Sequence, residues 1–311
     1  MKFKHEPVLL KQCIEGLKIN PDGVYVDGTL GGAGHSNSIL KNLSSKGKLI
    51  GIDRDDAALD FAIEKLKDYS NVEFVKDNHD NIKNILERLN IELVDGILLD
   101  LGVSSHQIDE FSRGFSYTKN SILDMRMDTS NGISAKEVIN TYEEERLANI
   151  IFEYGEEKFS RQIAKRICEI RKQKEITTTL ELADIVEKSV PSFVKKQGHP
   201  AKRTFQAIRI EVNNEIEPLY NTIIDSIKAL KNGGRLCVIT FHSLEDRAVK
   251  NAYVEATGKC RCPKEIPYCI CNPLKLGNII TKKPIEPDKD EIEENPRSKS
   301  AKLRIFERMK D

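Results

Sequence analysis

The sequence predicts an α/β protein with a mostly parallel, Rossmann-like sheet and an all-helical domain inserted into it. Three observations predict this fold class. Short apolar segments alternate with helical patterns over roughly the first third of the chain, and a glycine-rich loop follows the first of them. The middle of the 311-residue chain then shows helical periodicity alone.

The N-terminal part contains four apolar segments that we expect to be strands, at residues 24–29, 49–53, 72–75 and 96–100. Segments with helical spacing follow the first three of these strands, at residues 35–43, 57–67 and 82–89. Strands that alternate with helices in this way are joined by right-handed crossovers, so they form a parallel sheet.

The pattern changes after residue 105, where a polar, turn-rich segment leads into a region with a helical signal that lasts to about residue 232. A strand pattern returns at residues 236–241. The simplest organisation is therefore a sheet domain of residues 1–105 and 215–311. We expect residues 106–214 to form an inserted helical domain that recognises the substrate.

Details of the inserted region support helices with defined ends. Thr178 and Glu181 have the spacing of a capping box ahead of a helix. Apolar residues continue at steps of three and four from Phe205 to Leu230, and Pro218 is expected to kink or restart that helix. The glycine pair at 233–234 is expected to end it.

The composition predicts a cytoplasmic protein. Hydrophobic residues make up 39% and charged residues 32% of the chain. No apolar run approaches the ~18 residues that span a membrane, and residues 1–10 lack the apolar stretch of a secretory signal. The 7 cysteines are an odd number, which argues against a disulfide framework.

The net charge of zero conceals an uneven distribution. Residues 158–209 carry a net charge of +8 and residues 259–311 a net charge of +4, so the rest of the chain carries −12. A basic segment on an acidic body is typical of a protein with a polyanionic partner. A solvated helix surface explains the same charges, and the charge pattern alone leaves both interpretations open.

The glycine-rich loop at residues 26–35 indicates a nucleoside site. Glycines between a strand and a helix let the backbone turn sharply and approach a ligand. Asp53 ends the second strand, where an acidic side chain can bind two ribose hydroxyls. The alternative is that Asp53 caps the helix ahead of Ala57.

The loop does not have the glycine spacing of nicotinamide-binding proteins, because its glycines fall at 28, 31, 32 and 34. Asp27 precedes the first glycine, and its carboxylate would repel a pyrophosphate but attract an ammonium group. This favours S-adenosylmethionine, which has a sulfonium and an amino group and no phosphate.

A second motif occupies residues 95–105. Its run of apolar residues is typical of a central strand in a parallel sheet. Asp100 ends the strand, where open α/β sheets bind their ligands. A helix or turn cap is the structural alternative for Asp100.

These motifs belong to a longer set that resembles one family. The set includes HEPVLL (5–10), DGTLGGAGHS (27–36), DGILLDLGVSS (95–105), LDMRMD (123–128), HPAKRTFQAIRI (199–210), ITFHSLEDR (239–247) and NPRSKSAKLR (295–304). In this order they are similar to the ribosomal RNA small-subunit methyltransferase H family, also called MraW. The resemblance covers nearly the whole chain.

The resemblance implies a class I S-adenosylmethionine-dependent methyltransferase with an inserted helical domain. It further implies N4-methylation of a cytidine in the decoding centre of 16S ribosomal RNA, within the small ribosomal subunit, and a homodimer is left open. The implied cofactor contacts are Gly32, Ala33, Gly34, His35, Asp53, His79, Asp100 and Gln107. His79 replaces the aromatic residue usual at its position, and its imidazole can still stack on adenine.

The chemistry of a cytosine amine favours direct attack on the methyl group. The lone pair of this amine is conjugated with the ring, and acceptors on its N–H groups would localise it. Asp100, Ser104 and Ser105 are the nearest candidate acceptors. No Pro-Cys dipeptide occurs, so a cysteine nucleophile is not expected. His242 is a weaker candidate for contact with the base, and Ser243 with Asp246 has the spacing of a capping box.

Two further groups of residues remain open. Cys260, Cys262, Cys269 and Cys271 have enough thiols for a zinc site, although their spacing is tighter than in common zinc knuckles. Candidate phosphate contacts are Lys202, Arg203, Arg209, Arg297, Lys299, Lys302 and Arg304. A nicotinamide oxidoreductase and a non-catalytic RNA-binding protein remain the alternatives to a methyltransferase.

Overall fold

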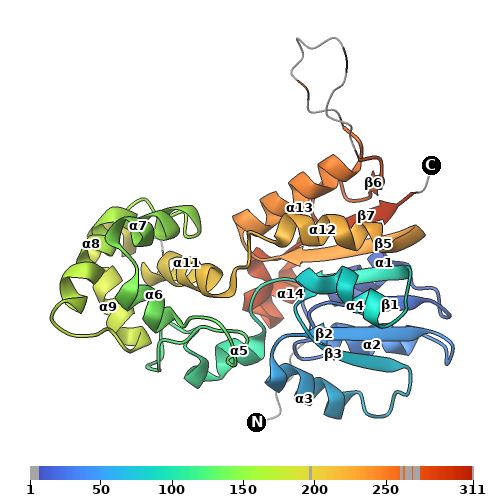
Figure 1. The fold of residues 1–311 in the computed structure, drawn as a ribbon, viewed down its shortest axis with the longest axis horizontal. Helices are drawn as coiled ribbons and strands as arrows, with labels where there is room; N and C mark the ends of the chain where they lie inside the picture. Colours follow the sequence, from blue (N-terminus) through green and yellow to red (C-terminus); the bar gives the residue numbers. More distant parts are fainter. Residues whose placement is uncertain (1–6, 196–197, 260–261, 263–267, 269–273, 310–311) are drawn as a thin grey trace. The chain divides into compact units, whose positions relative to one another are not determined.

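The computed structural model describes residues 7–195, 198–259, 262, 268 and 274–309. The chain divides into two compact units (Figure 1). One unit, here called the sheet unit, consists of residues 1–102 and 216–311, and the other, the helical unit, consists of residues 103–215. Each unit has a hydrophobic core formed by its own residues.

The sheet unit is built on a 7-stranded sheet with the order β3-β2-β1-β4-β5-β7-β6. The strands are β1 (Val24–Asp27), β2 (Lys48–Asp53), β3 (Val72–Lys76), β4 (Val94–Asp100), β5 (Leu230–Thr240), β6 (Gly277–Ile279) and β7 (Lys302–Arg308). Strands β1 to β5 pair in parallel, whereas β7 is antiparallel to both β5 and β6. The predicted Rossmann-like, mostly parallel sheet is confirmed.

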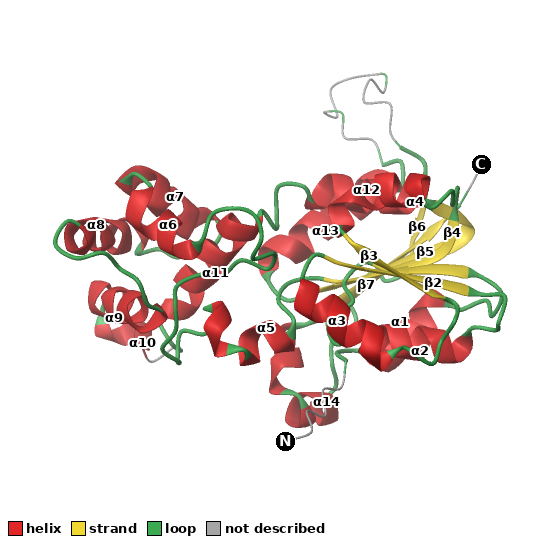
Figure 2. Ribbon diagram, turned by 60° about the horizontal axis from the view of Figure 1, so that its bottom comes forward, coloured by secondary structure: helices red, strands yellow, loops and turns green. Residues whose placement is uncertain are grey.

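Helices cover both faces of this sheet (Figure 2). The helices of the sheet unit are α1 (Leu10–Leu17), α2 (Gly34–Asn42), α3 (Asp56–Lys65), α4 (Ile82–Arg88), α12 (Leu219–Lys228), α13 (Ser243–Ala256) and α14 (Lys289–Glu294). One core contains residues of α4, α12 and α13, and the other contains residues of α1, α2 and α3. Strand β4 supplies Ile97 and Leu99 to the first core and Leu98 to the second, so consecutive apolar residues are required.

The helical unit contains α5 (Ser105–Asp109), α6 (Ala135–Thr141), α7 (Glu144–Glu153), α8 (Ser160–Arg171), α9 (Thr179–Ser189), α10 (Ser192–Lys195) and α11 (Ala201–Asn213). Its core gathers apolar residues from α6 to α9 and α11. The capping box of Thr178 and Glu181 at the start of α9 is confirmed. None of the helices in the described part of the chain is long and apolar enough to cross a membrane.

The expected restart of the helix at Pro218 is confirmed, but its expected end at the glycine pair is wrong. Helix α11 ends at Asn213, its C-cap residue Asn214 has a left-handed φ of 48°, and α12 begins directly after Pro218. Gly233 and Gly234 lie inside β5 instead of at a helix end. They occupy an irregularity in the pairing with β4, where Gly233 has a φ of 81°. Glycine adopts a positive φ readily both at a helix end and at an irregularity in a strand. The glycine pair alone therefore did not distinguish these two structures.

Candidate active site

Three aspartates end neighbouring strands at one edge of the sheet. Asp27 ends β1, Asp53 ends β2 and Asp100 ends β4, and β1 pairs in parallel with both other strands. The strand order changes direction between β1 and β4, and open α/β sheets bind ligands at the carboxyl ends of strands at such a switch point. The structure therefore brings together Asp53 and Asp100, which the sequence placed at strand ends, with Asp27, which the sequence placed before the first loop glycine.

The glycine loop lies so close to the sheet that its first glycine has no room for a side chain. The amide of Gly28 donates to the carbonyl oxygen of Leu98 at 2.9 Å, and a Cβ on Gly28 would lie 2.4 Å from Leu99 Cδ2. A Cβ on Gly32 would meet no described atom within 4 Å. The loop thus packs tightly at its start and borders open space at Gly32, where a ligand could approach the backbone.

Asp53 fixes the glycine loop. Its Oδ2 accepts a hydrogen bond from the amide of Gly31 at 2.9 Å, and its Oδ1 accepts one from the amide of Asp55 at 2.9 Å. The cap of α3 is Asp55, which accepts from the amide of Ala57 at 3.1 Å, so the alternative role of Asp53 as that cap is excluded. Burial raises the pKa of Asp53. A carboxylate oxygen has two lone pairs, so each keeps capacity for a ribose hydroxyl.

Asp27 is buried and organises the same loop from inside. Its Oδ1 accepts from the amide of Thr29 at 3.1 Å, and its Oδ2 accepts from the hydroxyl of Ser36 at 2.6 Å. The Thr29 hydroxyl oxygen in turn accepts from the amide of Asp100 at 2.7 Å, which links β1 to the end of β4. Burial raises the pKa of Asp27. Its negative charge would act on a ligand across the loop.

Asp100 has a carboxylate oxygen that the described protein leaves without a donor. Its Oδ1 is buried and has no hydrogen-bond partner among the described residues, while its Oδ2 lies 3.7 Å from Nδ1 of His35. Burial, followed by the negative charges of Asp27 and Glu245, raises the pKa of Asp100 to about 8. An unsatisfied buried acceptor is costly. A cationic or N–H-bearing ligand would satisfy it, so the site fits S-adenosylmethionine.

His35 joins this carboxylate to the N-terminal segment. Its Nε2 lies 3.0 Å from the carbonyl oxygen of Val8, so the hydrogen-bond network assigns the proton to Nε2 and leaves Nδ1 facing Asp100. Pro7 packs against Gly34, where a Cβ would lie 2.2 Å from Pro7 Cγ. The segment that precedes α1 therefore forms one wall of the glycine loop.

His79 begins the short 3₁₀ helix η1 (His79–Asn81) after β3. A Cβ on Gly28 would lie 3.2 Å from the Cβ of His79, so this residue lies beside the first glycine of the loop. Its Nε2 is 3.5 Å from Oδ1 of Asp80. This position agrees with an imidazole that flanks the nucleoside site.

Ser104 and Gln107 belong to the helical unit, where they cap α5. The hydroxyl of Ser104 accepts from the amide of Gln107 at 3.2 Å, and Gln107 Oε1 accepts from the amide of Ser104 at 3.0 Å. Ser105 begins α5, and its side chain lies outside the described part of the structure. Contacts of these three residues with the cofactor or base stay predictions.

The capping box expected from Ser243 and Asp246 is wrong. The cap of α13 is formed by His242 and Glu245, which satisfy each other's backbone amides. Asp246 instead pairs with Arg304 through two hydrogen bonds, at 2.6 and 3.0 Å. The pairs His242 with Glu245 and Ser243 with Asp246 have the same spacing and differ by one position. The sequence cannot distinguish them unless the first residue of the helix is known. His242 is thereby given a structural role.

Two candidate phosphate contacts are already engaged in ion pairs. Arg304 is buried against Asp246, and Arg209 makes hydrogen bonds of 2.9 and 2.8 Å with Glu215. We therefore remove both from the candidate phosphate contacts. Lys202 and Arg203 are exposed on α11.

The zinc hypothesis stays a prediction, because Cys260, Cys269 and Cys271 lie outside the described residues. Of the four, the structure describes Cys262.

Sequence reasoning missed three residues that support the loop. Thr29 and Ser36 provide the hydroxyls that hold Asp27 and the Asp100 amide, and Lys65 donates from α3 to the carbonyl oxygen of Gly32. The sequence signal for Thr29 and Ser36 was the presence of hydroxyl side chains inside the glycine motif. Lys65 gave none, because its contact joins segments far apart in the sequence.

The sheet order, the antiparallel β7 and the acidic switch-point site define a class I S-adenosylmethionine-dependent methyltransferase. The chain belongs to the MraW methylase family, whose pattern matches residues 2–309. The predicted family and the predicted methyl donor are thereby confirmed, and the nicotinamide oxidoreductase is excluded.

Known relatives are similar over their full length. A protein of Clostridium botulinum (strain Kyoto / Type A2) named ribosomal RNA small subunit methyltransferase H is 57% identical over 305 residues, which is 98% of this chain and 99% of that protein. The Finegoldia magna protein of the same name is 53% identical over 312 residues, 99% and 100% of the two chains. Among solved structures, an rRNA methylase from Streptococcus thermophilus has a TM-score of 0.40 and 14% identity, with 97% and 94% covered.

Proposed function

We propose that this protein transfers a methyl group from S-adenosylmethionine to the N4 amine of a cytidine in the decoding centre of 16S ribosomal RNA. The transfer is a direct in-line displacement without a covalent enzyme–RNA intermediate. Support for the substrate comes from the relatives, which are named for methylation of the small-subunit ribosomal RNA at 53% identity or more. The observation that carries the chemistry is the unpartnered carboxylate oxygen of Asp100 at the switch point.

Bound S-adenosylmethionine supplies an electrophilic methyl group. The residues proposed to hold it are the loop residues Gly32, Ala33, Gly34 and His35, with Asp53, His79, Asp100 and Gln107. Asp53 accepts hydrogen bonds from the ribose hydroxyls with the lone pairs that its backbone donors leave free. The negative charge at the ends of β1 and β4 favours the cationic end of the ligand.

The protein's main task is to orient the amine. Orientation of two reactants can lower a barrier by ~7–11 kcal/mol in the best cases. Asp100 accepts an N–H of the cytosine amine through its free oxygen, which localises the lone pair for attack and receives the released proton. Because burial raises the pKa of Asp100 to about 8 in the free protein, the cationic cofactor must displace its proton before the carboxylate can accept one from the amine. Ser104 and Ser105 are proposed as further acceptors.

The two buried thiols of the sheet unit do not suit covalent catalysis. In the sheet unit, Cys13 and Cys237 are buried, and burial raises the pKa of both thiols, that of Cys237 to about 12. A thiol with so high a pKa is not a nucleophile at neutral pH. This supports direct attack by the amine.

The helical domain, residues 106–214, is proposed to recognise the RNA. The segment 158–209 within it carries a net charge of +8, which suits a phosphate backbone. A structured RNA holds its cytosine amine within a stack or base pair, so the base must be turned out before transfer. Phosphate contacts would hold the flanking nucleotides meanwhile.

The test is methylation of small ribosomal subunits and of naked 16S ribosomal RNA, followed by mass spectrometry of the nucleosides. We expect N4-methylcytidine at one position of the decoding centre. The Asp100→Ala variant should lose at least a hundredfold in rate while its fold is retained. Methylation at C5 or at the ribose, or no methylation by the wild type, would contradict the proposal.

A further inference from the structure

Four positive side chains, here called the stripe, lie on α8 of the helical unit and at its two ends. Arg161 and Lys165 lie four residues apart on one side of α8, Lys172 is the C-cap residue, and Lys158 precedes the first helical residue by two positions. All four are exposed. The opposite side of α8, with Ile163 and Ile167, is buried in the core of the unit. At 1.5 Å per residue, the part of the stripe from Arg161 to Lys172 is about 16 Å long.

Neighbouring carboxylates do not neutralise this stripe. The acidic residues of segment 158–209 pair with other bases: Glu169 with Arg166, Glu175 with Lys136, Glu181 with Lys174, Asp184 with Lys188 and Glu187 with Lys195. Within the part of the chain that the structure describes, no ion pair involves a member of the stripe. The stripe therefore carries four positive charges of the segment without an ion-pair partner among the described residues, and Lys202 and Arg203 of α11 are exposed as well.

An exposed aromatic ring lies toward the N-terminal end of the stripe. Phe193 of α10 is 56% exposed, and its ring packs edge-on against Phe159, with centroids 6.1 Å apart. Phe159 is the chain neighbour of Lys158, the first cation of the stripe. An exposed ring that packs against a second ring can serve as a platform on which a base stacks.

We propose that this surface binds a single-stranded segment of the substrate RNA, with phosphates along the α8 stripe and a base stacked on Phe193. The inference rests on the proposed function, for which it names the RNA-binding surface. Cations spaced by one or two helical turns together with a single exposed ring suit a polynucleotide backbone and its bases. A membrane surface would need an exposed apolar helix face, but the apolar face of α8 is buried.

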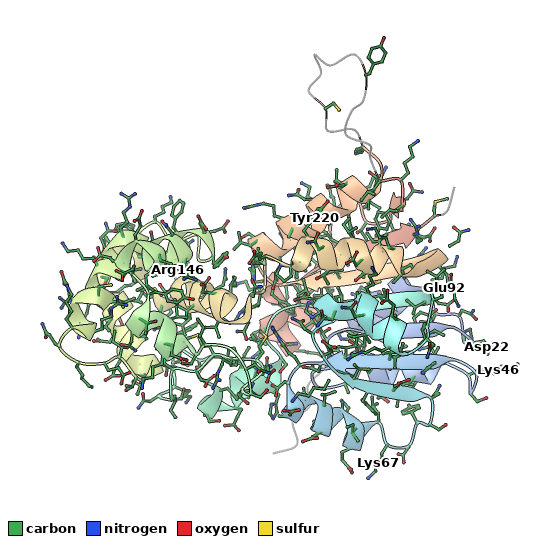
Figure 3. The ribbon with its side chains drawn as sticks, viewed as in Figure 1. Asp22, Lys46, Lys67, Glu92, Arg146 and Tyr220 are labelled. Carbon is green, nitrogen blue, oxygen red and sulfur yellow. The ribbon has the colours of Figure 1, made fainter. Side chains whose placement is uncertain are left out.

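The test compares two variants with the same change in net charge. The stripe variant is Lys158→Gln, Arg161→Gln, Lys165→Gln and Lys172→Gln. The control variant carries four exposed lysines of the sheet unit changed in the same way, Lys41→Gln, Lys46→Gln, Lys83→Gln and Lys250→Gln. Lys46 is labelled in Figure 3. The probes are a fluorescent 12-nucleotide single-stranded RNA, in rising KCl, and small ribosomal subunits.

The stripe variant should bind the oligonucleotide at least tenfold more weakly. Its slope of log affinity against log salt concentration should fall by about 3, because each lost phosphate contact on a single strand is worth ~0.7. The KM for small subunits should rise by a similar factor, with kcat and S-adenosylmethionine affinity unchanged. The control variant should stay within twofold of the wild type in RNA affinity, KM, kcat and S-adenosylmethionine affinity, with an unchanged salt slope.

The aromatic platform is tested separately with Phe193→Leu. This variant should bind the RNA about fivefold more weakly with an unchanged salt slope, since stacking releases no counterions. Its control is Phe61→Leu, which changes an exposed ring of the sheet unit. An unchanged affinity in Phe193→Leu would remove the ring from the site.

The outcomes separate the two proposals. Failure of the wild type to methylate ribosomal RNA would contradict the proposed function, whatever the stripe binds. Normal methylation by the wild type, with a stripe variant that matches its control in RNA affinity and KM, would overturn the binding surface alone. Loss of binding to phosphatidylglycerol vesicles, with RNA binding intact, would assign the stripe to a membrane instead.

Discussion

At the scale of single residues, the carboxyl edge of the sheet concentrates negative charge in a buried place. Burial raises the pKa of Asp27, Asp53 and Asp100, and the charge of Asp27 also raises that of Asp100. Two backbone amides donate hydrogen bonds to Asp53 in place of water. No described residue donates a hydrogen bond to Oδ1 of Asp100. A cationic ligand relieves both the desolvation and the repulsion, so ligand binding and protonation are coupled at this edge.

This coupling predicts that S-adenosylmethionine binds more tightly as the pH rises toward 8. Below a pKa of about 8, Asp100 is protonated in the free protein, and the ligand must displace that proton to meet a carboxylate. Affinity should therefore rise by up to tenfold per pH unit between pH 6 and 8. Titration calorimetry in buffers of different ionisation enthalpy should detect the released proton.

The Asp100→Asn variant is the control for this prediction, because the ligand's own amino group titrates equally with both proteins. Its affinity should change much less over the same pH range. The same raised pKa also makes the free wild-type protein lose stability as the pH rises from the unfolded-state value of about 4 to about 8. The melting temperature of Asp100→Asn should therefore fall less than that of the wild type as the pH rises over this range. Equal pH profiles for the two proteins would refute the coupling.

A second residue-scale prediction concerns Asp53. The Asp53→Ala variant should bind S-adenosylmethionine at least tenfold more weakly, because the ribose hydroxyls lose a charged acceptor and the Gly31 amide loses its partner. Calorimetry on the folded variant measures this. In the Asp55→Ala control, loss of the α3 cap should cost ~1 kcal/mol of stability while affinity stays within threefold. Unchanged affinity in Asp53→Ala would rule out the ribose role.

At the scale of elements, the loop between β1 and α2 has two glycines with different requirements. Gly28 is enclosed by Leu99 and His79, whereas Gly32 faces open space among the described residues. The first glycine is required by packing, and the second is required only if a ligand lies against it.

The pair Gly28→Ala and Gly32→Ala therefore separates stability from binding. Gly28→Ala should lower stability by ~1–3 kcal/mol, because its Cβ would clash with Leu99 Cδ2 at 2.4 Å. The free energy of unfolding of Gly32→Ala should lie within ~0.5 kcal/mol of the wild-type value. Its affinity for S-adenosylmethionine, however, should fall at least tenfold. Thermal melts and calorimetry provide both values. A Gly32→Ala protein with wild-type affinity would move the ligand away from this part of the loop.

At the scale of the whole molecule, the chain contains two units with separate cores. The core of the helical unit, from Leu123 to Ile208, draws only on residues between 103 and 215. Its backbone is also anchored internally, since Asn213 bonds to the backbone of Met125 and Met127 at 2.8 and 2.7 Å.

We therefore expect residues 103–215, produced alone, to fold. Circular dichroism should show a helical spectrum, and heating should give one cooperative transition. The matching variant replaces this segment by a short linker and should keep the fold of the sheet unit but lose methylation of small subunits. An unfolded 103–215 fragment would show that its core depends on the sheet unit.

Much of the sheet unit could be predicted from the sequence because its determinants are local. Apolar runs buried on both faces predict parallel strands, and a glycine loop followed by an acidic strand end predicts a nucleoside site. Strands β1 to β4 lie at the predicted places, and the three aspartates end β1, β2 and β4. The helix caps of α9 followed equally from spacing.

The sequence by itself determined the fold class, the family motifs and the strand-end aspartates, because periodicity and motif spacing act within a few residues along the chain. Tertiary structure alone decided which polar groups meet across it. It paired Arg304 with Asp246 and Arg209 with Glu215, placed the 233–234 glycines in a strand, and left one oxygen of Asp100 without a donor among the described residues. The physical reason is that burial and hydrogen bonding depend on segments brought together by packing, and spacing in the sequence does not encode those partners.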